Sequence, residues 1–313
     1  MKIGILGAGL SGLVCARALQ RAGKQVTVLE KSRSLSGRCA TRKFGEHVVD
    51  HGLQYFTLRD PAVRGEVEEV AGVELQKLTA PILQAEPKGT VYREGEERFY
   101  LRSGNNRLGK LLAAGVEVIT ETEVPRVEKS GRKWRMAGRE FDAVVSSAPW
   151  PQTAACLGIK VTEVGYEPCL TVLLEYLVGR SGAEGAYARI DASGNDPLAW
   201  IACENVKTGR VADGCTVYVI QAAPEYSRQH IEQNPEFWAS DLQVLLEKVW
   251  NLDSSKRGSV FAHRWRYARR KKDAPTPKDL PKGIFICGDS LTDSRLESVW
   301  KSGLAAANQL LNR

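Results

Sequence analysis

The sequence has little of what several common classes of protein require. Its 313 residues include seven cysteines without a C-x-x-C pair, and four histidines without the spacing of metal ligands. These patterns argue against a zinc site and a disulfide framework, and they predict a reducing, cytoplasmic location. The apolar run at 169–178 is short and interrupted by Glu175, too short to cross a bilayer. We therefore expect neither a metal nor a membrane partner.

The charge balance is basic, with a formal net charge of +7 at pH 7. The densest basic stretch, 263-HRWRYARRKK-272, precedes a proline-rich segment at 273–283. A solvated loop and an anion-binding surface both fit this stretch. Elsewhere basic residues alternate with acidic ones, so an anionic small molecule fits the charge better than a nucleic acid does.

A glycine-rich turn near the N-terminus carries the clearest motif. A short apolar strand leads into 7-GAGLSG-12, a helical pattern follows, and a second apolar strand ends at Glu30. This places Gly7, Gly9 and Gly12 at the glycine positions of the G-x-G-x-x-G motif. The first glycine permits a tight turn, the second lets a pyrophosphate approach, and the third lets helix and strand pack closely.

The same unit predicts how a dinucleotide would be held. Free N–H groups at the start of the helix, around Leu10 and Ser11, would bind phosphates. Glu30 lies 18 residues beyond Gly12, where a carboxylate accepts hydrogen bonds from both ribose hydroxyls and disfavours a 2′-phosphate. The alternative is a turn that uses the glycines for packing alone.

NAD and FAD both fit this motif, and further motifs distinguish them. Glu30 opens an E-K-x5-G-R pattern ending at Arg38, and a G-D pair at Asp289 precedes an E-x4-S-G-x2-A-A pattern that begins at Glu297. Together these resemble the flavin amine oxidase superfamily. Further stretches resemble the renalase-like family within it, including bacterial members: GRCATR (37–42), DHGLQYFT (50–57), HRWRYA (263–268) and ICGD (286–289).

The resemblance implies bound FAD. Covalent attachment through a cysteine occurs in this superfamily, but Cys287 lies within a predicted buried strand, so we expect noncovalent binding. Arg38 would meet the pyrophosphate, Asp289 would accept bonds from ribityl hydroxyls or organise water, and the backbone of Val124 would pair with the adenine edge. The helix that starts near Glu297 would direct its free N–H groups at the flavin. The remaining implied cofactor contacts are Lys31, Gly37, Gly52, Gln54, Tyr55, Phe56, Gly288, Ser298 and Val299. Ser36 replaces a glycine that is common in the family, which fits if its φ is negative.

No residue is assigned to catalysis itself, because flavin chemistry depends mainly on the cofactor. His51 is as compatible with a structural role as with a cofactor contact. Candidates for the substrate pocket are Tyr55, Trp200, Asn205, His263, Trp265 and Trp300.

The predicted fold class is α/β: a Rossmann-type FAD-binding domain with an inserted α+β substrate domain, as in p-hydroxybenzoate hydroxylase and amine oxidases. The FAD-binding domain would comprise residues 1–60, 104–150 and 280–313, and the substrate domain 61–103 and 151–279. The pattern at 235–250 predicts an amphipathic helix, with an apolar face of Phe237, Leu242, Leu245, Leu246 and Val249.

The resemblance also implies a reaction. Renalase-like enzymes oxidise the 2- or 6-dihydro isomers of NAD(P)H, passing a hydride to flavin N5 and then electrons to dioxygen, which gives hydrogen peroxide. The excess positive charge suits such a phosphate-bearing substrate. Two alternatives remain open: an FAD-dependent amine oxidase, and a flavin-binding protein without catalytic activity. The sequence leaves the oligomeric state open.

Overall fold

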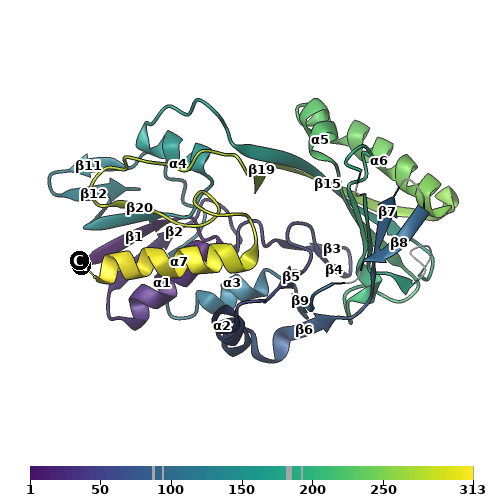
Figure 1. Cartoon of the computed structure of the whole chain (residues 1–313), viewed down its shortest axis with the longest axis horizontal. Coiled ribbons are helices and arrows are strands. Elements are labelled where there is room, and N and C mark those ends of the chain that lie inside the picture. The colour runs from purple at the N-terminus through teal and green to yellow at the C-terminus, as the bar shows by residue number, and fades with distance from the viewer. Residues whose placement is uncertain (87–88, 94, 181–184, 192, 313) are drawn as a thin grey trace.

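The computed structural model describes residues 1–86, 89–93, 95–180, 185–191 and 193–312. Figure 1 shows two halves, one containing the C-terminal helix and the other built around a large curved sheet. No helix in the described ranges is long and apolar enough to cross a membrane.

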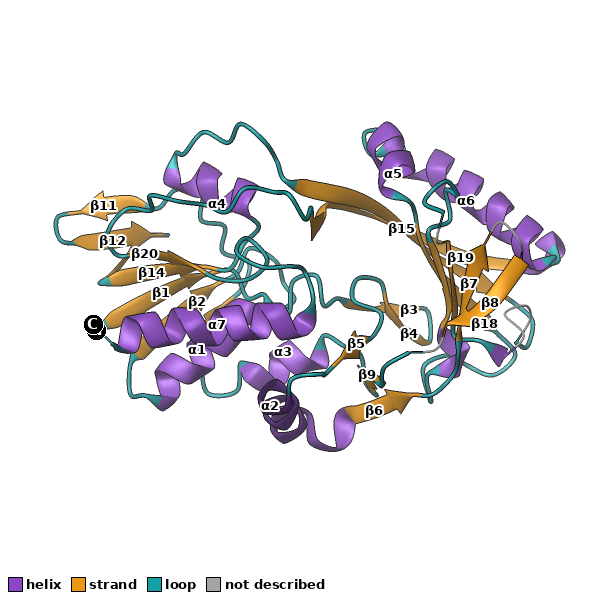
Figure 2. Cartoon of the chain, viewed as in Figure 1, coloured by secondary structure: helices purple, strands orange, loops and turns teal. Residues whose placement is uncertain are grey.

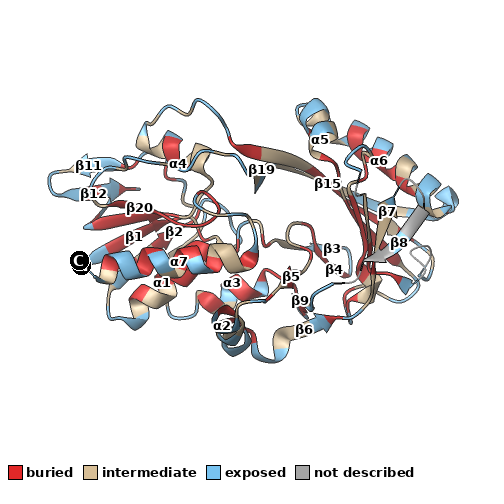
Figure 3. Cartoon of the chain, in the orientation of Figure 1, coloured by how far each residue is buried: buried red, intermediate tan, exposed pale blue. Residues whose placement is uncertain are grey.

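A parallel five-stranded sheet forms the centre of the first half. Its order is β10-β2-β1-β14-β20, and all neighbouring strands are parallel. Figure 2 shows β2, β1, β14 and β20 side by side. The strands are β10 (Glu117–Ile119), β2 (Gln25–Leu29), β1 (Lys2–Leu6), β14 (Ala143–Ser146) and β20 (Ile284–Ile286). Most of their residues are buried, as expected for parallel strands covered on both faces (Figure 3).

On one face of this sheet, four helices share an apolar core with the strands: α1 (Leu10–Arg21), α2 (Pro61–Ala71), α3 (Arg107–Leu112) and α7 (Leu296–Leu311). α1 packs on the strands, and α2 packs on α3 and α7. α1 and α7 come from opposite ends of the sequence and pack directly on each other (Figure 1). A Cβ atom added at Gly303 would lie 2.4 Å from the carbonyl oxygen of Ser11, so the contact requires glycine there.

A small antiparallel sheet covers the other face. It consists of β11 (Glu128–Ser130), β12 (Lys133–Met136) and β13 (Arg139–Phe141). Met136 and Phe141 pack against Leu29 and Val144 of the parallel sheet. After β14, α4 (Trp150–Leu157) leads towards the second half.

A seven-stranded sheet organises the second half, in the order β19-β15-β18-β17-β16-β7-β8. The strands are β7 (Ile82–Glu86), β8 (Gly89–Arg93), β15 (Tyr166–Tyr176), β16 (Ala188–Asp191), β17 (Trp200–Cys203), β18 (Thr216–Gln221) and β19 (Arg257–Arg270). Only the pair β16–β7 is parallel. One face carries α5 (Pro224–His230) and α6 (Pro235–Trp250), and the other looks towards the first half.

Helix α6 has the predicted bounds and most of the predicted apolar face: Leu242, Leu245 and Leu246 pack in the core, whereas Phe237 and Val249 are exposed. Phe237 is 72% exposed, whereas its neighbour Trp238 is 1% exposed and packs with Leu242 and Leu246. The expectation that Phe237 faces the core is therefore wrong. Phe237 and Trp238 are adjacent apolar residues at the edge of the apolar face of α6. The larger indole ring of Trp238 takes the buried position, and the ring of Phe237 stays exposed.

Two small sheets connect the halves: β3 (Thr41–Phe44) with β4 (His47–Asp50), and β5 (Phe56–Thr57) with β9 (Arg98–Leu101) and β6 (Leu75–Leu78). Helix α2 and strand β9 were expected in the substrate domain. Instead Val63, Val67 and Phe99 belong to the same core as α1 and α7. The segment 61–103 thus contributes to both halves, and residues 87, 88 and 94 within it lie outside the described ranges.

Candidate functional site

A cavity of about 2020 Å³ lies between the two halves. Gly9, Glu30 and Val124 of the first half line it, and so do Trp200 and Trp265 of the second half. The parallel sheet brings the carboxyl ends of its strands to this cavity, which is where ligands bind in open α/β sheets.

The glycine turn has the geometry predicted from its sequence. Gly7 has a φ of 91°, which favours glycine, and a Cβ atom at Gly12 would lie 2.6 Å from the carbonyl oxygen of Gly7. Gly9 lines the cavity, and a Cβ atom there would approach no protein atom closer than 3.7 Å. The protein itself therefore leaves room for a side chain at Gly9. No side chain caps the start of α1, so its first N–H groups, around Leu10 and Ser11, point out of the helix unpaired.

Glu30 lies at the end of β2, buried beside the cavity. Its Oε2 accepts a hydrogen bond from the N–H of Ala8 at 2.7 Å, and its Oε1 accepts one from the N–H of Ser32 at 2.8 Å. These bonds fix the carboxylate but leave each oxygen a further lone pair. Lys31 and Val124 also line the cavity at this end.

Asp289, just beyond β20, is the centre of a polar cluster at the cavity wall. Arg38 donates two hydrogen bonds to its carboxylate, with Nη1–Oδ2 and Nη2–Oδ1 distances of 2.5 and 2.7 Å. Tyr166 and Ser294 donate further bonds at 3.1 and 2.7 Å. Burial, then the nearby Asp289 carboxylate, raises the pKa of Tyr166 to about 12, so this phenol stays protonated. The structure thus pairs Arg38 with Asp289, two residues for which we expected separate cofactor contacts.

The loop between β2 and β3, which carries Arg38, has an unusual backbone. Ser36 has a φ of 83°, so the expectation of a negative φ is wrong. Its Oγ donates a hydrogen bond to the carbonyl oxygen of Asn106 at 2.7 Å, and its N–H bonds to the carbonyl of Ala8. These buried contacts hold a conformation that is strained for serine. Gly37, which follows, lines the cavity.

The start of α7 also faces the cavity. Leu296 and Val299 line it, and no side chain caps the helix. Glu297 turns away, because its Oε1 accepts the N–H groups of Arg59 and Asp60 at 2.7 and 2.6 Å. The remaining predicted residues of this helix, Ser298 and Trp300, do not line the cavity; Trp300 is in the core, and its indole N–H donates to Glu66 at 2.8 Å.

The stretch 50–57 divides between the cavity and the interior. His51 and Gly52 line the cavity. Gln54 points inward, where its Oε1 accepts hydrogen bonds from Tyr187 and Trp200, each at 3.4 Å. The next two predicted residues, Tyr55 and Phe56, pack in separate apolar clusters and do not line the cavity.

Aromatic side chains form the cavity wall in the second half. Trp200, His263 and Trp265 line it, and the rings of His263 and Trp265 lie 4.3 Å apart. Asn205 does not reach the cavity: its amide donates to the carbonyl of Cys215 at 2.7 Å and accepts from the N–H of Val217 at 3.0 Å.

Comparison with known proteins supports this arrangement. Residues 5–69 match the family model of an NAD(P)-binding Rossmann-like domain. Flavin-dependent L-tryptophan oxidase RebO of Lentzea aerocolonigenes is 53% identical over 45 residues, covering 14% of this chain and 10% of the relative. Phytoene desaturase of Cercospora nicotianae is 30% identical over 99 residues, covering 32% of this chain and 16% of the relative. The matches thus span less than a fifth of either curated relative.

Solved structures match the chain over nearly its whole length. A candidate protoporphyrinogen oxidase from Exiguobacterium sp. 255-15 has a TM-score of 0.83 at 13% identity, covering 100% of this chain and 99% of the other. Cyclohexylamine oxidase from Brevibacterium oxydans IH-35A has a TM-score of 0.75 at 12% identity, covering 100% and 99%. Reduced UDP-galactopyranose mutase has a TM-score of 0.81 at 10% identity, covering 99% and 95%.

The chain shares their fold. The predicted fold class, a Rossmann-type half combined with an α+β half, is confirmed. Because oxidases and a mutase share this fold, the fold leaves the reaction open. None of these proteins is described as a renalase, so that part of the resemblance stays a prediction.

A buried group of four charged residues lies behind the cavity wall, and the sequence analysis missed it. The side chains of Asp50, Glu204, Lys207 and Arg210 are all 0% exposed. Lys207 Nζ lies 2.9 Å from both Asp50 Oδ2 and Glu204 Oε1, and Arg210 Nη2 lies 3.0 Å from Asp50 Oδ2. The only signal in the sequence is the three-residue spacing from Glu204 to Lys207 to Arg210. The group ties β4 to the segment after β17.

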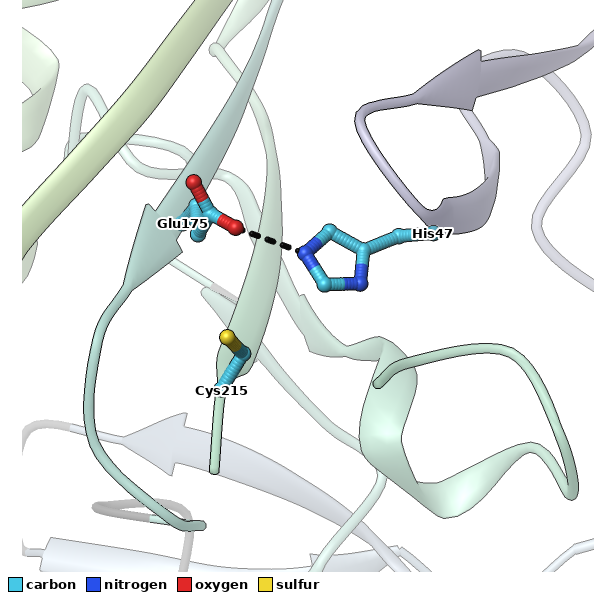
Figure 4. Close-up of side chains that lie close together, drawn as sticks. All are labelled: His47, Glu175 and Cys215. Atoms are coloured by element: carbon cyan, nitrogen blue, oxygen red, sulfur yellow. Dashed lines mark hydrogen bonds and ion pairs between the residues drawn. The ribbon is translucent and has the colours of Figure 1, made fainter. Parts of the chain in front are cut away.

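A second group that sequence spacing could not reveal is His47, Glu175 and Cys215, whose ligand-type atoms lie within 4.8 Å of one another (Figure 4). His47 Nδ1 accepts the N–H of Ala212 at 3.1 Å, so the proton of the neutral ring is on Nε2, which donates to Glu175 at 2.7 Å. A metal on Nε2 would require the opposite tautomer. The hydrogen bonds therefore favour a structural His–Glu pair over a metal site.

Proposed function

We propose that the cavity binds FAD noncovalently and that the protein is an FAD-dependent oxidoreductase. The observation that carries the proposal is that one cavity brings together an acidic strand end, an uncapped helix start beside a glycine, an arginine–aspartate pair and a second uncapped helix start. These are the groups that the ribose, the pyrophosphate, the ribityl chain and the flavin ring of FAD would each need.

The residues of this chain fit the parts of FAD in turn. Glu30 would accept the ribose hydroxyls with its remaining lone pairs, and the space at Gly9 would admit the pyrophosphate. The Arg38–Asp289 pair offers both a cation and hydrogen-bond acceptors beside the phosphates and the ribityl chain. The start of α7, at Leu296, would direct N–H groups at the flavin ring. Bound FAD would supply the capacity to accept a hydride and pass two electrons to dioxygen.

The state of the cysteines supports noncovalent binding. Cys287 is fully buried beneath the glycine turn, and burial raises the pKa of its thiol to about 12. Cys169 lines the cavity, and burial raises the pKa of its thiol to about 11. Attachment through sulfur requires a thiolate, and these environments oppose its formation.

For the substrate we favour a dihydronicotinamide dinucleotide, the 2- or 6-dihydro isomer of NAD(P)H. The second half lines the cavity with flat aromatic rings, which suit a pyridine ring, and basic side chains such as Arg42 and Lys43 line it nearby. Neither makes an ion pair with a described residue. An amine substrate is the second candidate, since cyclohexylamine oxidase shares the fold. Unpaired cations in the wall disfavour a cationic amine.

Anaerobic mixing tests this proposal. The purified protein should be yellow, and its oxidised flavin band should bleach within seconds when a dihydronicotinamide isomer is added. Primary amines serve as the comparison. Rapid bleaching by amines alone would reverse the order of the two candidates. Failure of the protein to take up FAD would refute both. Denaturation followed by ultrafiltration should release all the yellow colour.

A further inference from the structure

Arg42, on β3, lines the cavity without an acidic partner. Its guanidinium carbon lies 3.8 Å from the centre of the Phe261 ring on β19, so the side chain is oriented by a cation–π contact. Arg42 makes no ion pair with any residue in the described ranges. Arg42 is exposed, so water rather than an acidic side chain solvates its charge. A cation oriented at a cavity wall in this way can exchange that water for a ligand anion.

Two histidines lie next to this cation. The rings of His51 and His263 are 5.2 Å apart, and both contact Trp265, at 5.5 and 4.3 Å. Both residues line the cavity. Neither imidazole forms a hydrogen bond with a described residue, and His51, 7% exposed, has a buried Nδ1 without a partner. Buried polar atoms are rarely left unpaired, and the described protein residues leave the His51 ring without a hydrogen-bond partner. The other nitrogen of His51 and both nitrogens of His263 are not among the buried unpaired atoms, so these are the ones that a ligand in the cavity could reach.

The charges around the histidines keep both rings neutral. Burial, then His263 and Arg42, lowers the pKa of His51 to about 4, and burial followed by Arg42 lowers the pKa of His263. Asp50, on β4, raises the pKa of His51, but this is the smallest of the four effects. The Asp50 carboxylate accepts hydrogen bonds from Lys207 and Arg210, whose positive charges offset its own. Of the described residues on β19, only His263 is among the charged neighbours that shift the pKa of His51.

We propose that Arg42, His51 and His263 form a binding site for an anionic group of the substrate, a phosphate or a carboxylate. Arg42 would supply the permanent charge, and the two imidazoles would supply N–H donors beside it. The proposal rests on the proposed function, because the corner adjoins the aromatic wall where the substrate ring would lie. It adds the requirement that the substrate carries an oxyanion near its reacting ring.

The site predicts a coupling between anion binding and proton uptake. Without a ligand, burial and Arg42 keep the imidazoles uncharged at neutral pH. A bound anion offsets both effects, so it raises the pKa of His51 and His263. Binding then takes up protons, and the dissociation constant falls as the pH is lowered from about 8 to about 6.

The test measures equilibrium binding to the FAD-loaded protein by calorimetry, without turnover. Nicotinamide mononucleotide is the phosphate probe. Nicotinamide riboside, which lacks the phosphate, is its counterpart. Benzoate is the carboxylate probe and benzamide its neutral counterpart. We expect the anionic member of at least one pair to bind at least about tenfold more tightly than its counterpart, and more tightly at lower pH. The preferred pair distinguishes phosphate from carboxylate.

Variants locate the effect. Arg42→Gln should remove most of the preference for the anion, and Arg42→Lys should restore part of it. His51→Gln should abolish much of the pH dependence. Arg132→Gln makes the same charge change on the exposed turn between β11 and β12, far from the cavity lining, and should bind like the unmodified protein. Equal effects of Arg42→Gln and Arg132→Gln would overturn the proposal, and so would failure of both anions to bind.

These outcomes separate the site from the reaction. If dihydronicotinamides bleach the flavin but Arg42→Gln binds anions normally, the anion site is wrong and the proposed function stands. If anion binding depends on Arg42 while no dihydronicotinamide reduces the flavin, the site stands and the proposed substrate is wrong.

Discussion

Replacing Lys207 with methionine should destabilise the protein strongly. The ammonium group is fully buried. It donates hydrogen bonds to Asp50 at 2.9 Å and to the carbonyl of Gln54 at 2.8 Å, and it forms an ion pair with Glu204 at 2.9 Å. The group contains two negative and two positive charges, so its net charge is zero. Methionine at position 207 leaves the two carboxylates with Arg210 as the only cation of the group. Removing one partner of a buried ion pair costs about 3–5 kcal/mol.

Thermal unfolding measures this loss. Unfolding entropy is roughly 2.1 cal/mol/K per residue, so over a chain of 313 residues a loss of 3–5 kcal/mol lowers Tm by about 5–8 °C if both halves unfold together. Burial already raises the pKa of Glu204, and loss of Lys207 raises it further. A carboxyl group with a raised folded pKa stabilises the protein at low pH and loses this contribution as the pH rises. The destabilisation should therefore be smaller at about pH 5 than at about pH 8.

A double variant separates charge balance from lost packing. Glu204→Gln combined with Lys207→Met leaves Asp50 facing Arg210, one charge of each sign. We expect the double variant to be more stable than the sum of the single changes predicts, by about 2–3 kcal/mol. Simple additivity would refute the view that these four residues act as one balanced group.

Two further predictions concern the nucleotide end of the cavity. Glu30→Ala should raise the Kd for FAD roughly 10- to 150-fold, because loss of a charged acceptor costs about 1.5–3 kcal/mol. Fluorescence titration of the apoprotein measures this Kd, with Glu30→Gln as the matched control. An unchanged Kd would remove Glu30 from this role. Ser36→Gly and Ser36→Ala both lose the hydrogen bond to Asn106, but only glycine relieves the positive φ, so the glycine variant should be more stable by about 1 kcal/mol. Equal Tm values for the two variants would contradict the strained backbone.

The elements that the sequence predicted well are those whose chemistry is local. The turn at Gly7, the close contact at Gly12 and the position of Glu30 follow from a single strand–helix–strand unit, where spacing dictates geometry. Trp200 and Trp265, two of the candidates for the substrate pocket, line the cavity. Whether FAD contacts the predicted residues stays a prediction.

The features that the sequence did not predict depend on contacts between distant segments. Gln54 was expected at the cofactor, but hydrogen bonds from Tyr187 and Trp200 hold it inside. Both Phe237 and Trp238 were expected in the core, but packing against the sheet buries only Trp238 and leaves Phe237 exposed. Periodicity reports which residues are apolar, whereas burial depends on which face another segment covers.

The loop after β4 links the buried charges to the cavity. Asp50 anchors the loop to Lys207 and Arg210, while the next residue, His51, lines the cavity beside Arg42. The carbonyl oxygen of His51 also accepts the indole N–H of Trp265 at 3.1 Å. The position of the imidazole therefore depends on a salt-bridge group that does not itself reach the cavity. Both partners of each ion pair in this group are buried, and such a pair tolerates little displacement. The group can therefore hold the cavity wall in one shape whether or not a substrate is present.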